Sequence, residues 1–148
     1  MLDINPDIII EKYYSFVLPE NISDFNFKEF DYVIDAIDTV SAKIAIAEAS
    51  TNAQTTMISC MGTGNKTDPS ALKITDLAKT SVCPLARVMR RELKARGITH
   101  LRVIFSEEEP HRAIKNAEGK PVPASVAFVP SVAGLLAASD AVKEIISK

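Results

Sequence analysis

The chain of 148 residues has the length of about one domain, and its 47% hydrophobic and 24% charged residues are ordinary for a soluble globular protein. A formal net charge of −2 excludes a surface that is basic all over and coats nucleic acid by charge alone. Two cysteines are too few for a disulfide framework or a four-cysteine zinc site. We therefore expect a reduced cytoplasmic protein, with no signal peptide after Met1 and no apolar stretch long enough to cross a bilayer.

The first half of the chain is predicted to alternate strands and helices. β-Branched and aromatic residues over 8–17 predict a first strand, followed by one helical turn begun by Ser23 or Asp24. The elements that follow are a strand at 32–37, a helix at 41–52 and a strand at 55–61. Strand, helix and strand with short links form a βαβ unit, whose two strands are parallel.

The second half is predicted to be more irregular. Its elements are strands at 72–78, 100–105 and 124–128, a helix at 84–96 and a last helix from Ser131, which follows Pro130. Gly97 ends the helix at 84–96 as a C-terminal cap. The polar segment 107–123 between the last two strands is predicted to be a mobile loop.

Asp35 and Asp38 follow the apolar strand at 32–37, and Lys43 lies on the first turn of the next helix. In α/β sheets, ligands bind beyond the carboxyl ends of parallel strands, and Mg²⁺ takes one or two protein carboxylates together with substrate phosphates. Asp38 is therefore a candidate Mg²⁺ ligand and Lys43 a candidate phosphate contact. A structural interpretation stays open, in which Asp38 caps the helix and Asp35 accepts hydrogen bonds from nearby amides.

The run 62–66, Gly-Thr-Gly-Asn-Lys, lies at the carboxyl end of the neighbouring strand and should line the same crevice. Glycine permits close approach of a ligand to the backbone, although a plain turn explains these residues equally well. None of the five glycines belongs to a G-x-G-x-x-G or Walker phosphate loop. The sequence therefore has the character of the back half of a nucleotide-using enzyme, without its front half.

The helix at 84–96 carries two further candidates. Cys83 precedes it, where the helix field favours a thiolate nucleophile, but no base accompanies the thiol and a structural role fits as well. Arg87, Arg90 and Arg91 make the helix basic, as a solvated face or an RNA contact would be. His100 is expected to be structural and His111 exposed.

Seven short motifs together resemble the C-terminal part of the ThiF/MoeB/HesA family of ubiquitin-activating-like adenylating enzymes. They lie at 3–6, 30–38, 61–69, 76–80, 84–86, 105–108 and 130–134. Each motif is weak alone, but their order and spacing match along the whole chain.

The resemblance implies an α/β fold with a Rossmann-like parallel sheet that lacks its first βαβ unit, a mixed or antiparallel extension and a final helix. Residues 1–148 would form one partial adenylating domain, with the remaining Rossmann-like part at 1–69 and the substrate and dimerisation part at 70–148. Absence of the C-x-x-C pairs of other branches favours the branch that cyclises a carboxylate-bearing tRNA adenosine with ATP.

The resemblance also assigns residues. Asp38 would be the catalytic residue, whose carboxylate holds Mg²⁺ on ATP, and Asp35, Thr39 and Lys43 would line the nucleotide site. The tRNA surface would comprise Arg87, Arg90 and Arg91. The protein would form a homodimer, and this chain alone would not adenylate. Residues 124–127 contain no cysteine, unlike the same segment of some relatives, so a thiol role has no support.

Two rival hypotheses stay open. The chain could be a non-catalytic dimerising remnant, or one half of a split adenylating enzyme that acts on a small sulfur-carrier protein.

Overall fold

The computed structural model describes residues 1–122 and 124–147, in which one sheet has the strand order β1-β2-β4-β3. The strands are β1 (Val33–Asp35), β2 (Met57–Cys60), β3 (Leu72–Asp76) and β4 (Arg102–Ser106). β1, β2 and β4 are parallel, whereas β3 is antiparallel to β4. The expected α/β sheet with an antiparallel extension is confirmed.

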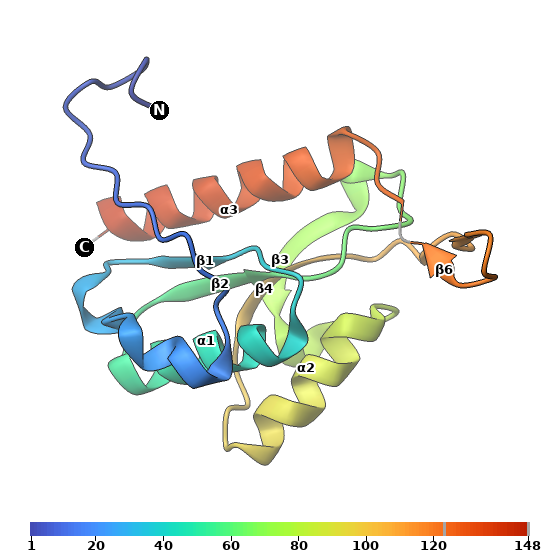
Figure 1. Ribbon diagram of the computed structural model, residues 1–148, viewed down its shortest axis with the longest axis horizontal. Coiled ribbons are helices and arrows are strands. Elements are labelled where there is room, and N and C mark those ends of the chain that lie inside the picture. Colours follow the sequence, from blue (N-terminus) through green and yellow to red (C-terminus); the bar gives the residue numbers. More distant parts are fainter. Residues whose placement is uncertain (123, 148) are drawn as a thin grey trace.

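Helices cover both faces of this sheet (Figure 1). α1 (Val40–Ala53) and α2 (Pro84–Ala95) lie on one face, and α3 (Phe128–Ile146) lies on the other. α2 buries Ala86, Met89 and Leu93 at helical spacing, so most of its basic residues are left exposed, whereas Arg90 is half-buried. The helix ends at Ala95, and Gly97, directly after the C-cap Arg96, has a φ of +78°, the left-handed conformation that is common just past a helix end.

A polar cluster fastens α3 to the sheet. The Tyr32 hydroxyl, next to β1, donates to the Asp140 carboxylate on α3, and Arg102 on β4 lies 3.5 Å from the same carboxylate. Arg102 also bonds Glu144 one turn further on. Burial and the Asp140 hydrogen bond raise the pKa of Tyr32. The apolar contacts of α3 are thus supplemented by ion pairs at its C-terminal half.

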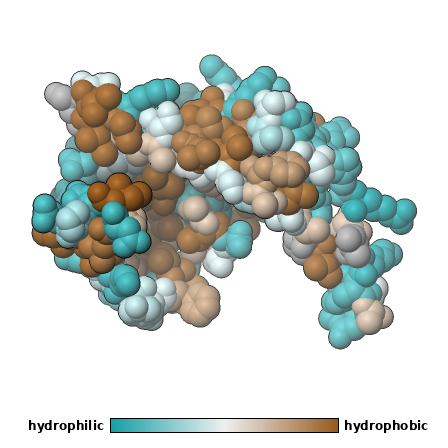
Figure 2. Space-filling view, turned by 90° about the horizontal axis from the view of Figure 1, so that it is seen from above, coloured by the Kyte–Doolittle hydropathy of each residue, from teal (hydrophilic) through white to brown (hydrophobic). Residues whose placement is uncertain are grey.

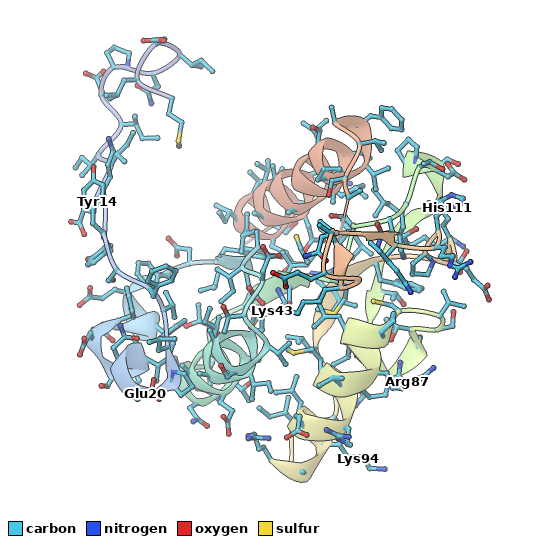
Figure 3. The ribbon with its side chains drawn as sticks, turned by 45° about the vertical axis from the view of Figure 1, so that its right-hand side comes forward. Tyr14, Glu20, Lys43, Arg87, Lys94 and His111 are labelled. Carbon is cyan, nitrogen blue, oxygen red and sulfur yellow. The ribbon has the colours of Figure 1, made fainter. Side chains whose placement is uncertain are left out.

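The strand predicted over 8–17 is wrong. These residues form an extended arm that leaves the sheet, and Tyr14 on the arm is 93% exposed (Figure 3). The residues have strand-forming side chains, but within the described part of the chain no strand pairs with them. The arm leads into two short turns, η1 (Pro19–Asp24) and η2 (Phe27–Glu29), where one turn was expected from Ser23 or Asp24.

The strand predicted over 124–128 is also wrong, because α3 begins at Phe128, earlier than its predicted start at Ser131. Pro130 fits in the first turn, where a backbone N–H has no helical partner to lose. Ser131 does not cap the helix, since its hydroxyl donates to Ala127 O at 2.5 Å.

The predicted loop at 107–123 contains a small hairpin, made by β5 (Ile114–Lys115) and β6 (Pro121–Val122). Pro123, the last residue of the predicted loop, lies outside the described residues. Figure 2 views the molecule from the α3 side, where this segment projects as a mostly hydrophilic arm. Among the described residues, no helix combines the length and the apolar character that crossing a membrane requires.

Candidate functional site

A cleft of about 700 Å³ opens at the carboxyl ends of β1 and β2, within the size range of small-molecule sites. The segments that line it are 36–38 after β1, 60–66 at and after β2, 83–85 at the start of α2, residues 110 and 125, and the first turns of α3. Asp38 and the run 62–66 therefore line one crevice, as the sequence predicted.

Asp35 and Lys43 form a fully buried ion pair behind this cleft. The Lys43 ammonium lies 3.0 Å from both Asp35 oxygens and also donates to Ile37 O at 3.1 Å. Ser59 Oγ, on the neighbouring strand, donates to Asp35 Oδ2 at 2.6 Å, and Ile37 N donates to Oδ1 at 3.2 Å. Figure 3 shows Lys43 in the interior of the molecule.

The four residues predicted to contact the nucleotide are thus divided by the structure. Asp35 and Lys43 do not line the cleft, and their charges are directed at each other rather than at a ligand. Asp38 lines the cleft and is exposed. Thr39 is also exposed but is not among the residues that line the cleft. The N-cap of α1 is Thr39, without a side-chain hydrogen bond, so the alternative in which Asp38 caps the helix is wrong.

The opposite part of the cleft is basic and contains thiols. Lys66 is only 2% exposed, and its ammonium donates to Ser106 O, at the end of β4, at 3.1 Å. Burial lowers the pKa of Lys66. Buried Cys83 is the N-cap of α2 and its Sγ accepts from Ala86 N at 3.5 Å. Burial raises the pKa of Cys60, at the end of β2.

Sequence reasoning included Lys66 in the glycine loop but did not identify it as a site residue. Its position directly after two glycines and an asparagine at a strand end was the available signal. The missing information was that the side chain turns inward to reach β4.

Two residues from distant segments hold the loop 62–69 in place. Asn65 N donates to Ala124 O at 2.7 Å, and its side-chain oxygen accepts from Ala124 N at 3.0 Å. Glu108 accepts from the backbone N–H groups of Thr67 and Asp68 at 2.9–3.0 Å, which lowers the pKa of its carboxyl. The loop is therefore a fixed wall of the cleft.

The two histidines lie outside the cleft. His111 is exposed, as predicted, and its Nε2 lies 3.2 Å from both Thr67 Oγ1 and Glu108 Oε1 (Figure 3). His100 is exposed, with Nδ1 3.1 Å from Asp76 Oδ2, and its structural role stays a prediction.

The three arginines predicted to meet RNA have different surroundings. Arg90 is bound to the backbone before α2, donating to Leu77 O at 3.1 Å and Thr80 O at 2.7 Å. Arg91 is exposed and pairs with Glu92 at 2.8 Å. Arg87 is exposed on the outer side of α2 (Figure 3). Arg87 and Arg91, but not Arg90, are thus placed to meet a large partner.

The family model for the ThiF family matches residues 1–148. A tRNA threonylcarbamoyladenosine dehydratase of Bacillus subtilis is 37% identical over 97% of this chain and 62% of its own length. The Escherichia coli protein of the same name is 36% identical over 62% of this chain and 34% of its own length.

Solved structures of the Escherichia coli enzyme give the same result. Its complexes with AMP and with ATP superpose at TM-scores of 0.86 and 0.84, with 28% sequence identity, over 99% of this chain. The chain covers 61% and 60% of those proteins. It therefore spans less than two thirds of the relatives that it matches.

Proposed function

The chain belongs to the ThiF family, and we propose that it forms the cleft-bearing part of an ATP-dependent tRNA threonylcarbamoyladenosine dehydratase. The observation that carries the proposal is the likeness over 99% of this chain to an enzyme solved with ATP, at a TM-score of 0.84. The cleft beyond β1 and β2 supports it, because this is where α/β sheets bind ligands.

The proposed reaction has two steps. A carboxylate oxygen of the threonylcarbamoyl group attacks the α-phosphorus of ATP, and the bond to pyrophosphate breaks. An atom of the same substrate's carbamoyl group then attacks the acyl carbon, AMP leaves with the carboxylate oxygen, and a carbamoyl N–H proton is released to solvent. The net change in the tRNA is the loss of one water, and the protein contributes positioning and charge neutralisation.

The residues at the cleft suit Mg²⁺ carried by a nucleotide rather than a metal held by protein alone. In the described residues, no group of three or more His, Cys, Asp or Glu side chains could hold a metal ion. Both Asp35 oxygens already have partners, whereas Asp38 is exposed at the cleft. One carboxylate beside substrate phosphates is a usual Mg²⁺ site. Asp38 would hold the ion, Thr39 would lie beside it, and Asp35 with Lys43 would fix the turn.

Residues 1–148 contain no glycine-rich phosphate loop. We therefore propose that these residues by themselves do not adenylate, because the backbone amides that hold nucleotide phosphates are not among them. Isothermal calorimetry with ATP and Mg²⁺ checks this directly. A micromolar affinity for the isolated chain would contradict it.

The proposed function is tested in a chimaera, with residues 1–148 replacing the matching part of the Bacillus subtilis relative. Modified tRNA is digested after the reaction, and the nucleosides are analysed by mass spectrometry for the loss of one water. The chimaera should be active with ATP, and Asp38→Asn should lower kcat by about a hundredfold, as loss of one charge-stabilising group does. A folded chimaera that leaves the nucleoside unchanged would refute the proposal.

The tRNA surface is proposed to include Arg87 and Arg91 on α2, where exposed cations can meet phosphates. Replacing either by glutamine should weaken tRNA binding and reduce its dependence on salt. We also propose a cytoplasmic location, since the proposed substrate is a tRNA.

A homodimer is proposed because two surfaces are left open in the described residues. β1 pairs only with β2, so its other edge is unpaired, and α3 exposes Leu135, Val142 and Ile146. Figure 2 shows hydrophobic residues on the face of the molecule that α3 covers. Sedimentation equilibrium should give twice the chain mass. The open β1 edge equally favours half of a split enzyme, which a pull-down that recovers a glycine-rich partner chain would support.

A further inference from the structure

Lys66 is a buried cation that forms no ion pair in the described part of the chain. Its ammonium has three N–H donors, and the structure gives it one hydrogen bond, to the neutral carbonyl of Ser106. Cys83 and Glu108 act on this charge from a distance and raise the pKa of Lys66 against the larger effect of burial, but neither forms an ion pair with it among the described residues. A buried charge is costly unless it is paired, so this arrangement favours an anion from outside the chain.

The surroundings of Lys66 suit such an anion. Lys66 lines the cleft together with Cys83, Pro84 and Leu85, which begin the 12-residue helix α2. Pro84 has no N–H and Ala86 N donates to Cys83 Sγ, so the N–H of Leu85 and the helix dipole make that end of α2 electropositive. The other walls near it, Met61 and Ala133, are apolar and match the uncharged remainder of a small acid.

The separation between Lys66 and Asp38 leaves room for two substrates of one reaction. Its ammonium sits over the end of β4, two strands from β1, which Asp38 follows. Neighbouring strands are about 4.8 Å apart, so the two positions are separated by about 10 Å across the sheet. A nucleotide phosphate near Asp38 and a carboxylate near Lys66 can therefore occupy the cleft side by side.

We propose that Lys66 and the N-terminus of α2 bind the carboxylate of the acyl substrate and orient it toward the nucleotide. This assignment rests on the proposed function, since it names the residue that takes the group to be adenylated. The ammonium offsets the repulsion between that carboxylate and the phosphates of ATP, and its remaining N–H groups fix the attacking oxygen.

The test uses N-carbamoyl-L-threonine, which has a carboxylate and a carbamoyl group, and its amide, which has no charge. Binding to the 148-residue chain is measured by ligand-observed NMR. The acid should bind at least about tenfold more tightly than the amide, because a hydrogen bond to a charged group is stronger than a neutral one. This comparison is made in the wild-type chain and does not depend on the folding of a variant.

Substitutions of single lysines then test whether Lys66 causes the preference for the acid over the amide. Lys66→Gln should lower affinity for the acid about tenfold and leave the amide unchanged, and Lys66→Arg should retain most of the affinity. Lys73→Gln is the matched control, because Lys73 is exposed and paired with Glu107 outside the cleft. Equal binding of acid and amide, or a Lys66→Gln variant that still prefers the acid, would overturn the assignment.

Two further experiments distinguish a carboxylate ligand from a phosphate ligand, and the Lys66 assignment from the proposed dehydratase function. Inorganic phosphate that displaces the acid at equal or lower concentration would make Lys66 a phosphate contact and overturn the carboxylate assignment. In the chimaera, Lys66→Gln should raise KM for the modified tRNA more than KM for ATP. Activity that is unchanged by Lys66→Gln but lost in Asp38→Asn would refute only this inference and leave the dehydratase function supported.

Discussion

The two lysines buried at the strand ends differ in what neutralises them. Lys43, on α1, is 0% exposed and meets both oxygens of Asp35, which in turn accept from Ser59 and Ile37. Lys66, on the loop after β2, is buried to nearly the same degree, yet it meets one neutral carbonyl.

The difference separates a structural cation from one available to a ligand. A buried pair whose hydrogen bonds are complete fixes a unique local geometry, here the turn that presents Asp38. A buried cation without a counter-ion costs stability, and it is retained where an anionic ligand can offset that cost.

Lys43→Met should lower the free energy of unfolding by about 3–5 kcal/mol, because it leaves the Asp35 carboxylate buried without a counter-charge. Urea denaturation followed by circular dichroism measures the loss. The double variant Asp35→Asn/Lys43→Met should recover part of it, since no uncompensated charge is left. A double variant as unstable as the sum of the two single variants would show that the pair is not coupled.

Lys66→Met should change the free energy of unfolding by only about 1 kcal/mol. It removes one hydrogen bond to Ser106 O but also removes an uncompensated buried charge, and the two effects oppose each other. The same denaturation experiment applies. If Lys66→Met lowered the free energy of unfolding as much as Lys43→Met, Lys66 would be a structural cation and the two lysines would not differ in role.

The stability of the wild-type chain relative to Lys66→Met should increase as the pH rises toward 10.5, the ordinary lysine value. Burial lowers the pKa of Lys66 in the folded state, so the folded chain releases this proton before the unfolded chain does. Below the lowered pKa, Lys66 is charged in both the folded and the unfolded chain, and the cost of burying its charge then lowers the free energy of unfolding by its full amount. A flat difference across this alkaline range would contradict the burial of an uncompensated ammonium.

Glu108→Gln tests the loop that carries Lys66 and should have the smallest effect. The Glu108 carboxylate accepts backbone bonds from Thr67 and Asp68, and these lower its pKa below the ordinary 4.5. The stability it contributes is therefore present above pH 4.5 and is lost as the pH falls through the lowered pKa. The gap in the free energy of unfolding between wild type and Glu108→Gln should therefore close on acidification, and a gap that persists at low pH would contradict this.

The sequence predicted the parts of the fold in which local pattern and burial agree. The apolar run at 32–37, the helix after it and the strand at 55–61 became β1, α1 and β2, with ends displaced by a few residues. The run 8–17 has equally good strand residues, but a strand also needs a partner, and pairing is not a local property. At 124–128 the prediction failed because Pro130 followed by Ser131 is typical of a helix that begins at Ser131. The actual start of α3 at Phe128 therefore could not be recognised from the sequence.

The site was predictable in position but not in the direction of its side chains. The strand-end rule placed Asp38 and the glycine loop at one crevice correctly. It could not show that Asp35 faces the interior, where the register sets it beside Ser59. α1 is buried around most of its first turns, so no polar face in the sequence indicated that Lys43 points inward. The roles of Asp38, Thr39 and the arginines stay predictions.

The most direct measurement is an NMR titration of the Lys66 side chain, with and without N-carbamoyl-L-threonine. The side-chain signals of Lys43 are recorded in the same spectra for comparison. Lys66 should titrate below the ordinary lysine range in the free chain, and its pKa should rise when the carboxylate binds, while the Lys43 signals stay unchanged. A Lys66 pKa that does not move at saturating ligand, or a response at Lys43 instead, would contradict the division between a structural lysine and a ligand-binding one.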